Sequence, residues 1–448
     1  MSYIALSDQD KKEMLARLGV SSVEELFGCI PEDSRLRRDL NLPPAMSEPE
    51  LLGHMDAVAG RNTYGRHRSF LGGGTYHHYI PAVVDSLSAR TEFLTPYTPY
   101  QPEVSQGTLQ VIFEYQTLIC RLTGMDIANA SLYDGASAAA EAALMARRLT
   151  GRSRILVARS LHPQYRETVR TLTRNLGLAV EEVGFGGDGG LNPEELRAKT
   201  GPDVCGLIVQ SPNFFGVVED LAACAAAVHE SKGLLIVSVA EALSLGILEA
   251  PGKLGADIVC GEAQSFGIPP SFGGPGLGFM GCKKEYLRQL PGRICGLTKD
   301  VEGRRGFVLT LSTREQHIRR EKATSNICSN QGWCALRATI YLESAGQNGL
   351  RDIALQNVRK AAYAAGKLAA VGGIRLRFTG KTFNEFVLQL PKDAAAAAAA
   401  LRAKGILAGL ELAPLYPELP GTMLVCVTEV RSKEEIDGLA AALEEVLR

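Results

Sequence analysis

The feature that most constrains the fold is a series of short apolar segments that alternate with helix-like segments in the middle of the chain, between residues 154 and 260. Five of the apolar segments have the length and composition of buried strands: 154–158, 179–183, 204–209, 234–239 and 257–260. Helical patterns near 164–176, 193–199 and 219–232 separate most of them. Apolar strands that alternate with helices predict a mainly parallel sheet with helices on both faces, so we expect an α/β fold.

The rest of the chain suggests two further parts. Residues 1–60 predict short helices that begin with capping boxes at Ser7, Ser21 and Ser47, and so small a segment cannot bury a core of its own. We expect it to be a helical arm that wraps the main body or a partner. Residues 61–345 would form the large domain, and 346–448 a smaller α+β domain whose last helix is capped at Ser432.

Composition excludes several classes of function. Lys and Arg number 48 and Asp and Glu 49, so no net charge favours binding to nucleic acid or to an anionic membrane. The apolar runs are far shorter than a membrane span, and the N-terminus does not resemble a signal peptide. The ten cysteines form no Cys-x-x-Cys pair, which predicts reduced thiols and a cytoplasmic protein. We expect His77 and His78 to lie in a surface loop and predict no metal site, because no third ligand is visible.

A long loop, 261–276, separates the strand 257–260 from a second apolar run at 277–280. Its length exceeds that of a simple connector, and its glycines and prolines commit the backbone to turns. Enzymes that use pyridoxal phosphate (PLP) carry their cofactor-binding lysine in a strand–loop–strand of this kind. Here the chain has no lysine between Lys253 and Lys283.

Three other positions carry polar residues in an order that fits a PLP pocket. The turn before the alanine-rich helix that starts near Gly135 offers free N–H groups to a phosphate. Asp134 and Ser137 also allow an ordinary helix cap, and a carboxylate there would repel the phosphate. Glu241 fits either a contact to a pyridine nitrogen or a turn cap. His162 would either stack on a cofactor ring or begin a helix.

Three longer strings carry a family resemblance: FLGGGTYHHY at 70–79, TPYQPEVSQG at 98–107 and TREQHIRREKATSNIC at 313–328. They resemble the P-protein of the glycine cleavage system, and more narrowly subunit 1 of the two-subunit glycine dehydrogenase (decarboxylating). The similarity extends over nearly the whole chain. It implies the fold of PLP enzymes of fold type I, with a large mainly parallel domain and a small C-terminal domain.

The resemblance also implies a division of labour between two related subunits. The companion subunit has a lysine four residues before an Ile-Pro pair. Here Ile268-Pro269 matches, and Gln264 stands at the lysine position. An amide cannot form an imine, so we expect the isolated chain to be inactive. We expect Asp134, Gly135, Ser137, His162, Glu241 and Gln264 to form a degenerate pocket.

The partners follow from the same resemblance. Subunit 2 would hold PLP covalently in an α2β2 assembly, glycine would be the substrate, and the lipoyl group of H-protein would receive the aminomethyl group. Two segments of this chain are predicted to reach the partner's site. One is a turn expected at the PLP phosphate, and the other is a wall of that site: Thr324, Ser325 and Asn326 for the turn, and Tyr97, Thr98, Tyr100, Gln101 and Glu103 for the wall.

Two alternatives stay open at this point. A self-sufficient PLP-dependent lyase or transaminase would require a lysine elsewhere in the chain. A purely structural scaffold would leave the two loop segments without any role in chemistry.

Overall fold

A computed structural model of the protein describes residues 5–94, 98–324, 327 and 329–448. The chain divides into two compact units, Met1–Tyr64 and Gly65–Arg448. The three predicted domain ranges, 1–60, 61–345 and 346–448, stay predictions.

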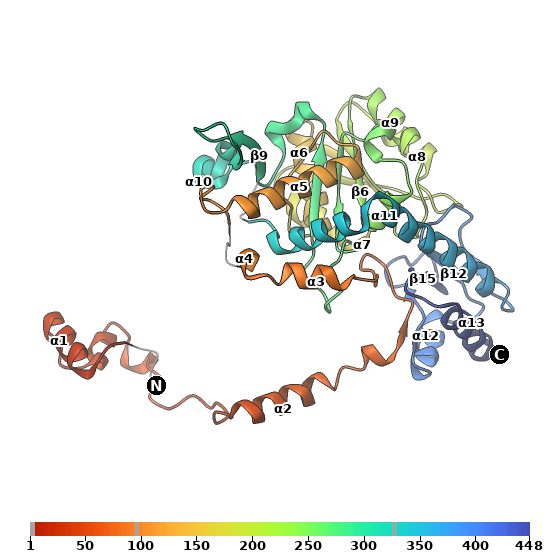
Figure 1. The fold of residues 1–448 in the computed structure, drawn as a ribbon. Coiled ribbons are helices and arrows are strands. Elements are labelled where there is room, and N and C mark those ends of the chain that lie inside the picture. Colours follow the sequence, from red (N-terminus) through yellow and green to blue (C-terminus); the bar gives the residue numbers. More distant parts are fainter. Residues whose placement is uncertain (1–4, 95–97, 325–326, 328) are drawn as a thin grey trace. The chain divides into compact units, whose positions relative to one another are not determined.

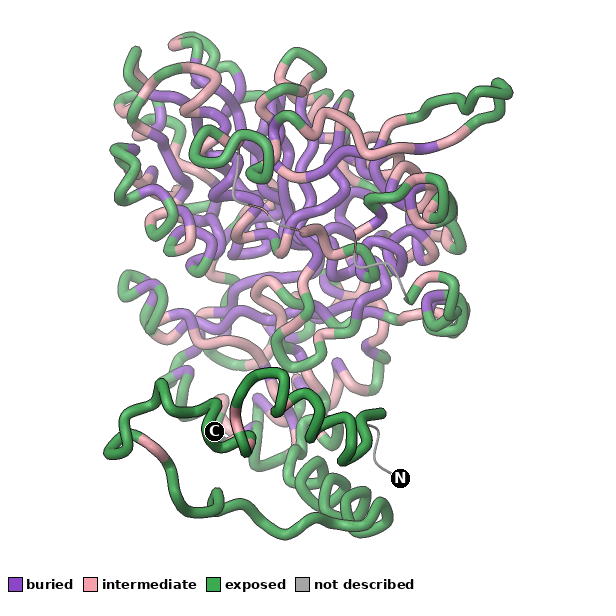
Figure 2. Tube along the Cα trace, turned by 90° about the vertical axis from the view of Figure 1, so that its left-hand side faces the viewer, coloured by how far each residue is buried: buried purple, intermediate pink, exposed green. Residues whose placement is uncertain are grey.

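The first unit consists of short helices without a core. The helices α1 (Asp8–Leu18) and α2 (Glu48–Ala59) begin with the predicted capping boxes at Ser7 and Ser47. The box predicted at Ser21 is wrong, because Ser22 is the N-cap of a short 3-10 helix, η1 (Val23–Phe27), and Ser21 bonds to Glu25. None of the described residues 5–64 is buried, as Figure 2 shows near the N-terminus.

The large sheet of the second unit has seven strands in the order β2-β8-β7-β6-β5-β3-β4. Their bounds are β2 (Ile127–Ala128), β3 (Arg154–Ala158), β4 (Ala179–Val183), β5 (Val204–Gln210), β6 (Leu234–Val239), β7 (Ile258–Glu262) and β8 (Gly278–Cys282). Strands β3 to β7 pair in parallel, which confirms the prediction. Strands β7 and β8 pair antiparallel, as do β8 and β2.

Helices cover both faces of this sheet (Figure 1). Alternate residues of a strand point to opposite faces, and Leu207 and Ile208 accordingly belong to different core clusters. The cluster on one face includes residues of α5 (Gln106–Thr123), α8 (Pro193–Lys199), α9 (Leu221–Glu230) and α11 (Gly332–Ala369). The cluster on the other face includes residues of α6 (Gly135–Thr150) and α7 (Pro163–Thr173).

A smaller antiparallel sheet lies in the C-terminal part of the unit, in the order β11-β12-β15-β14. Its strands and helices are β11 (Arg375–Leu376), β12 (Glu385–Gln389), β14 (Leu410–Glu411), β15 (Thr422–Cys426), α12 (Ala394–Ala403) and α13 (Lys433–Leu447). The predicted capping box at Ser432 is confirmed. Strand β1 (Arg68–Ser69) pairs with β13 (Ile406–Leu407), and the N–H of Cys426 donates to the carbonyl of Phe70 at 2.9 Å. The segment that follows β1 is thereby held against the small sheet.

The remaining elements connect these layers: α3 (Ala82–Ser88), α4 (Thr91–Leu94), β9 (Ile294–Lys299), β10 (Arg305–Thr310), α10 (Gln316–Arg319), and the 3-10 helices η2 (Glu32–Ser34), η3 (Tyr64–Arg66), η4 (Ala242–Gly246), η5 (Pro251–Leu254), η6 (Lys284–Gln289), η7 (Ser312–Arg314) and η8 (Arg320–Lys322). Among the helices formed by the described residues, none combines the length and the apolar character needed to cross a membrane.

Candidate functional site

The candidate site lies where β7 ends and the long loop begins. Gln264 is buried there, with 5% of its surface exposed. Its Oε1 accepts the N–H of Tyr76 at 3.0 Å, and its Nε2 donates to the carbonyl oxygens of Tyr76, at 3.1 Å, and of Ile268. The amide is therefore engaged by the main chain of two separate loops.

The cavity beside Gln264 has a volume of about 300 Å³. Its lining residues are Gly73, Gly74, Thr75, Asp134, Ala136, His162, Gln164, Tyr165, Glu262, Gln264, Pro270, Gly273, Gly274, Pro275 and Gly276. None of these described residues is a lysine, so the chain offers no substitute amine at this place.

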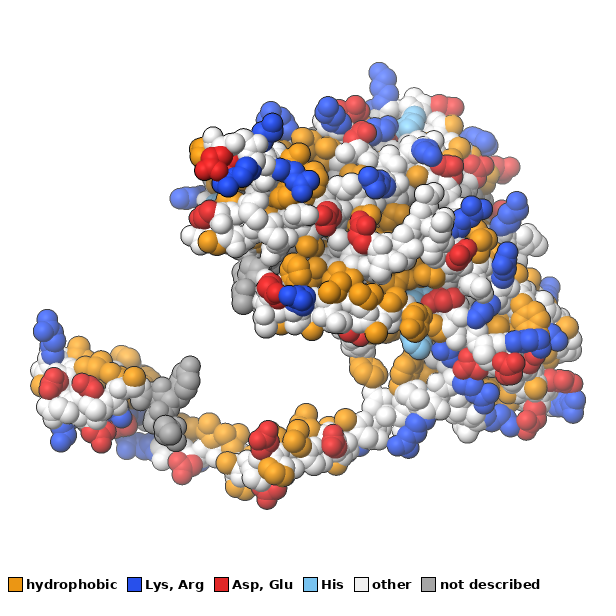
Figure 3. All heavy atoms as spheres, in the orientation of Figure 1, with side chains coloured by type: hydrophobic (Ala, Val, Ile, Leu, Met, Phe, Trp, Pro, Cys, Tyr) orange, Lys and Arg blue, Asp and Glu red, His pale blue; other side chains and the backbone are white. Residues whose placement is uncertain are grey.

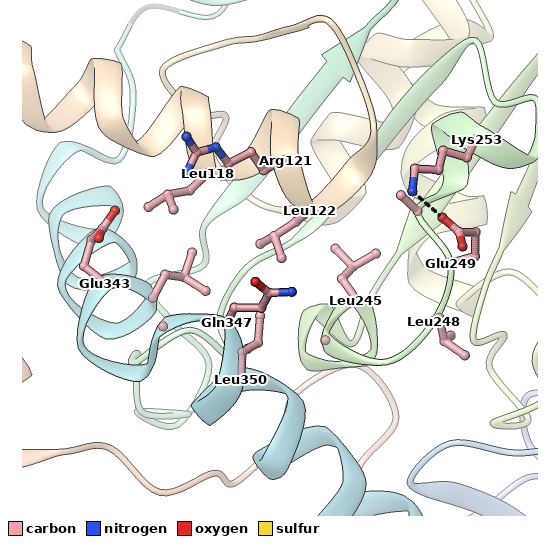
Figure 4. Close-up of a pocket in the computed structure, with 14 residues that line it drawn as sticks. Leu118, Arg121, Leu122, Leu245, Leu248, Glu249, Lys253, Glu343, Gln347 and Leu350 are labelled. Atoms are coloured by element: carbon pink, nitrogen blue, oxygen red, sulfur yellow. Dashed lines mark ion pairs between the residues drawn. The ribbon is translucent and has the colours of Figure 1, made fainter.

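The two lysines that flank the loop in sequence serve other contacts. Lys253 lines a different cavity of about 480 Å³, among leucines of α5, η4 and α11 (Figure 4), and its Nζ is 2.9 Å from Oε1 of Glu249. Lys283 forms an ion pair with Asp257. A lysine next to the loop in sequence is thus not next to Gln264 in space.

The turn before α6 is an ordinary helix cap. Asp134 is the N-cap, and its Oδ1 accepts the N–H of Ser137 at 2.7 Å in a capping box. The N–H of Gly135 donates to Oε2 of Glu262 at 3.0 Å. Of the two interpretations of Asp134 and Ser137, the structure bears out the cap.

Glu241 contacts protein groups on both carboxylate oxygens. Its Oε1 accepts the N–H of Leu243 at 3.0 Å, so Glu241 caps η4. Its Oε2 lies 2.9 Å from Nε2 of His78 and 3.0 Å from Nδ2 of Asn384. The carboxylate that would otherwise face a cofactor ring is paired with the imidazole of its own chain.

His78 lies between two carboxylates, with its Nδ1 2.7 Å from Oε2 of Glu429. Burial lowers the pKa of His78, but Glu241 and Glu429 outweigh burial and raise it to about 10. His78 is therefore a buried imidazolium. The prediction that it lies in a surface loop is wrong, because the segment after β1 folds inward, whereas His77 is exposed.

The glycine-rich segment that precedes His78 is closely packed. Oε1 of Glu385 accepts the N–H of Gly73 at 2.6 Å, and Oε2 accepts the hydroxyl of Tyr76 at 2.8 Å. Gly74 has φ +107°, and a Cβ there would lie 2.6 Å from Nε2 of His162. Only glycine fits such a backbone at this distance.

His162 begins α7 and uses both ring nitrogens. Its Nδ1 accepts the N–H of Gln164 at 3.1 Å, so its Nε2 carries the hydrogen and donates to the carbonyl of Gly73 at 2.7 Å. Burial lowers the pKa of His162 to about 4, which keeps the ring neutral. The structure therefore favours the helix start over stacking on a cofactor.

These residues do not fit a resident PLP. Gln264 supplies no amine, Glu262 accepts an N–H at the helix end where a phosphate would bind, and Glu241 is paired with His78. The acidic side chains beyond the ends of β6 and β7 are thus paired with groups of this chain itself.

The segment predicted to form a wall of the partner's site is only partly described, since Tyr97 lies outside the described residues. The Oγ1 of Thr98 is buried without a hydrogen-bond partner in the described structure. Tyr100 is 61% exposed, and its hydroxyl accepts from Nη2 of Arg293 at 2.9 Å. Gln101 and Glu103 are both exposed.

Ser325 and Asn326 also lie outside the described residues. The N–H of Thr324 donates to the carbonyl of Arg314 at 3.1 Å. Thr324 lines a cavity of about 490 Å³ together with Glu141 and Arg148. Neither Thr324 nor any described residue of the predicted wall lines the cavity beside Gln264.

Sequence reasoning missed five residues of the hydrogen-bond networks around Gln264 and Glu241: Tyr76, His78, Glu262, Glu385 and Glu429. One of them had a signal in the sequence. Glu262 is the only charged residue between Asp257 and Lys283, and a lone carboxylate directly after a buried strand is costly unless it has a partner. The other four come from segments far apart in sequence.

Comparison with known proteins gives the family. The model of the family described as glycine cleavage system P-protein matches residues 1–443. The chain belongs to this family. A probable glycine dehydrogenase (decarboxylating) subunit 1 of Moorella thermoacetica is 52% identical over 447 residues, covering 100% of both chains. The protein of the same name from Geotalea uraniireducens is 53% identical over 447 residues, with the same coverage.

Solved structures agree with this assignment. The inhibitor-bound crystal structure of a glycine decarboxylase (P-protein) of the glycine cleavage system matches with a TM-score of 0.90 and 44% identity over 100% of both chains. The glutamate decarboxylase of Lactobacillus brevis matches with a TM-score of 0.69 at 14% identity, covering 94% of this chain and 97% of the other. The second match shows the fold alone, which is that of PLP enzymes of fold type I, as predicted.

Proposed function

We propose that this chain is subunit 1 of a two-subunit glycine dehydrogenase (decarboxylating) of the glycine cleavage system, and that subunit 2 holds the PLP. The observation that carries the proposal is the pocket at Gln264, where an amide stands in place of an amine and Glu262 accepts the backbone N–H at the start of α6. The full-length similarity to relatives named subunit 1 supports the same assignment.

In this proposal the assembly decarboxylates glycine and passes the aminomethyl group to the lipoyl group of H-protein. PLP, bound by the partner, supplies the stabilisation of negative charge that decarboxylation requires. In the same proposal this chain contributes surface to the partner's site, through Tyr100 and Thr324 among the described residues. Tyr100 is suited to this role because it is exposed while Arg293 fixes its hydroxyl.

The assembly is proposed to be α2β2 and cytoplasmic, where the ten cysteines would stay reduced. The absence of buried residues from the described part of the arm, 5–64, supports association with another chain. Hydrophobic side chains gather along α2 (Figure 3), and Leu51, Leu52, Met55 and Val58 are all exposed. Such a surface is typical of an interface.

The test is to purify the chain together with its subunit 2 and to assay the exchange of glycine carboxyl with bicarbonate. We expect exchange by the complex and none by either chain alone. Exchange by this chain alone would favour the self-sufficient enzyme, which the absence of lysine from the described lining of the Gln264 cavity disfavours. No exchange by the complex would refute the proposal.

A further inference from the structure

Three backbone N–H groups converge on the carboxylate of Glu262. The N–H of Gly135, the first residue of α6, donates to Oε2 at 3.0 Å. The N–H groups of Leu277 and Gln264 donate to Oε1 at 2.6 and 3.1 Å. Glu262 is only 6% exposed, so these bonds are shielded from water. The arrangement is that of a bound anion held by main-chain donors at a helix N-terminus.

A second carboxylate takes another donor of the same helix end. Asp134 accepts the N–H of Ser137 at 2.7 Å. Two of the N–H groups that a helix start leaves free are thus used by acidic side chains of the chain itself. An incoming phosphate would have to displace these bonds and would meet two like charges.

The surroundings offer a phosphate no compensation. The residues that line the cavity beside Glu262 include Asp134 and Glu262, and the described lining contains neither lysine nor arginine. The space is also restricted, since a Cβ on Gly135 would lie 2.1 Å from the hydroxyl of Tyr165 and 3.0 Å from Cβ of Glu262. The described lining of the cavity is therefore acidic, whereas a phosphate dianion requires positively charged groups or free hydrogen-bond donors.

We infer that Glu262 is the residue that excludes the phosphate of PLP from this chain, because its carboxyl oxygens already accept the backbone N–H groups at the start of α6. The inference rests on the proposed function, in which the partner alone holds the cofactor. It assigns the loss of cofactor binding to two separate changes. Gln264 removes the covalent bond, and Glu262 occupies the phosphate position.

The test uses Glu262→Ala in the complete complex, with PLP already bound by the partner, so that any additional phosphate bound is on this chain. Binding of inorganic phosphate is measured by equilibrium dialysis at constant ionic strength. We expect one additional phosphate for each copy of the variant chain, with an affinity at least roughly tenfold above that of the wild-type complex.

A matched control is Glu219→Ala. Glu219 is 8% exposed and also accepts a backbone N–H, that of Leu191 at 2.8 Å, but it does not line the cavity. This variant loses a comparable buried carboxylate and is expected to bind no more phosphate than wild type. Equal binding by both variants, or by neither, would overturn the inference.

Failure of the variant to assemble is also informative. If Glu262→Ala yields no complex in chloride buffer, phosphate in the buffer should restore assembly. The added anion then binds the backbone N–H groups that Glu262 accepts in the wild-type chain. Assembly in neither buffer would overturn the inference. The glycine–bicarbonate exchange of the wild-type complex tests the proposed function separately, since phosphate binding does not depend on the reaction.

Discussion

The side-chain amide of Gln264 forms two hydrogen bonds with the backbone of Tyr76, one accepted and one donated, as paired residues of neighbouring β-strands do. Oε1 of Gln264 accepts the N–H of Tyr76 at 3.0 Å, and Nε2 donates to its carbonyl at 3.1 Å. The position at which the family resemblance predicts a lysine in the companion subunit is thus a structural link in this chain. It joins the end of β7 to the glycine-rich segment after β1.

The first prediction concerns Gln264→Lys. The variant should form no covalent adduct with PLP, because Glu262 and Asp134 still occupy the start of α6. It should also be less stable by about 1–3 kcal/mol, since the backbone groups of Tyr76 lose their partner. Mass spectrometry after borohydride reduction would detect a pyridoxyl group on the introduced lysine, and finding one would contradict the prediction. Wild-type chain treated in the same way is the control.

The second prediction concerns pH. Burial, with a smaller contribution from the charge of Asp134, raises the pKa of Glu262 to about 7 from the ordinary value of 4.5. The folded chain therefore holds this proton more tightly than the unfolded chain. The resulting stability is complete below pH 4.5 and is lost as the pH rises through 7.

Glu262→Gln removes this ionisation and keeps an acceptor oxygen. Wild type should lose stability relative to the variant between about pH 5 and 8, by up to roughly 3 kcal/mol. Urea unfolding of both proteins at several pH values measures the difference. A difference that stays constant with pH would show that the carboxyl group does not titrate in this range.

The third prediction concerns the buried imidazolium. In His78→Ala the carboxylates of Glu241 and Glu429 lose their shared cation, so the variant should be destabilised by about 3–5 kcal/mol at neutral pH. The neighbouring exposed residue provides the control, and His77→Ala should change stability by less than about 1 kcal/mol. Equal shifts of the two urea midpoints would show that the network does not support the fold.

The fourth prediction is that Thr324 reaches the partner's cofactor. Loss of one donor to a charged acceptor costs roughly 1.5–3 kcal/mol, so Thr324→Ala should weaken PLP binding in the complex on the order of ten- to a hundredfold. Thr310→Ala, on β10, is the control. PLP titration of the two complexes decides the matter. If both hold PLP like wild type, the contact lies elsewhere.

The fifth prediction concerns the arm. Deletion of residues 1–64 removes a unit in which no described residue is buried, so the remaining body should still fold. Association with subunit 2 should weaken, because the exposed apolar side chains of α2 are lost. Light scattering of the full-length and shortened chains with the partner, over a range of concentrations, measures this, and assembly of the shortened chain to the same stoichiometry at the same concentrations would contradict it.

The sequence by itself determined the local elements and the family. Parallel strands β3 to β7, the capping boxes at Ser7, Ser47 and Ser432, and the absence of lysine after β7 follow from local residue patterns. Each of these patterns extends over a few neighbouring residues. The folded chain keeps the predicted strands because their apolar residues are buried in it. The wrong prediction of a capping box at Ser21 also has a local cause, because the helix begins one residue later and its N-cap is Ser22.

Only the tertiary structure decided which polar side chains pair with one another around Gln264 and Glu241. His78 lies between Glu241 and Glu429, and Glu262 accepts the N–H of Gly135. These contacts join residues more than a hundred positions apart in sequence. No local pattern specifies such pairs, because they depend on how β1, the small sheet and the start of α6 meet the carboxyl ends of the strands. Sequence analysis missed Glu262, although its lone charge after a buried strand was a signal that the carboxylate has a partner, and the fold determined which one.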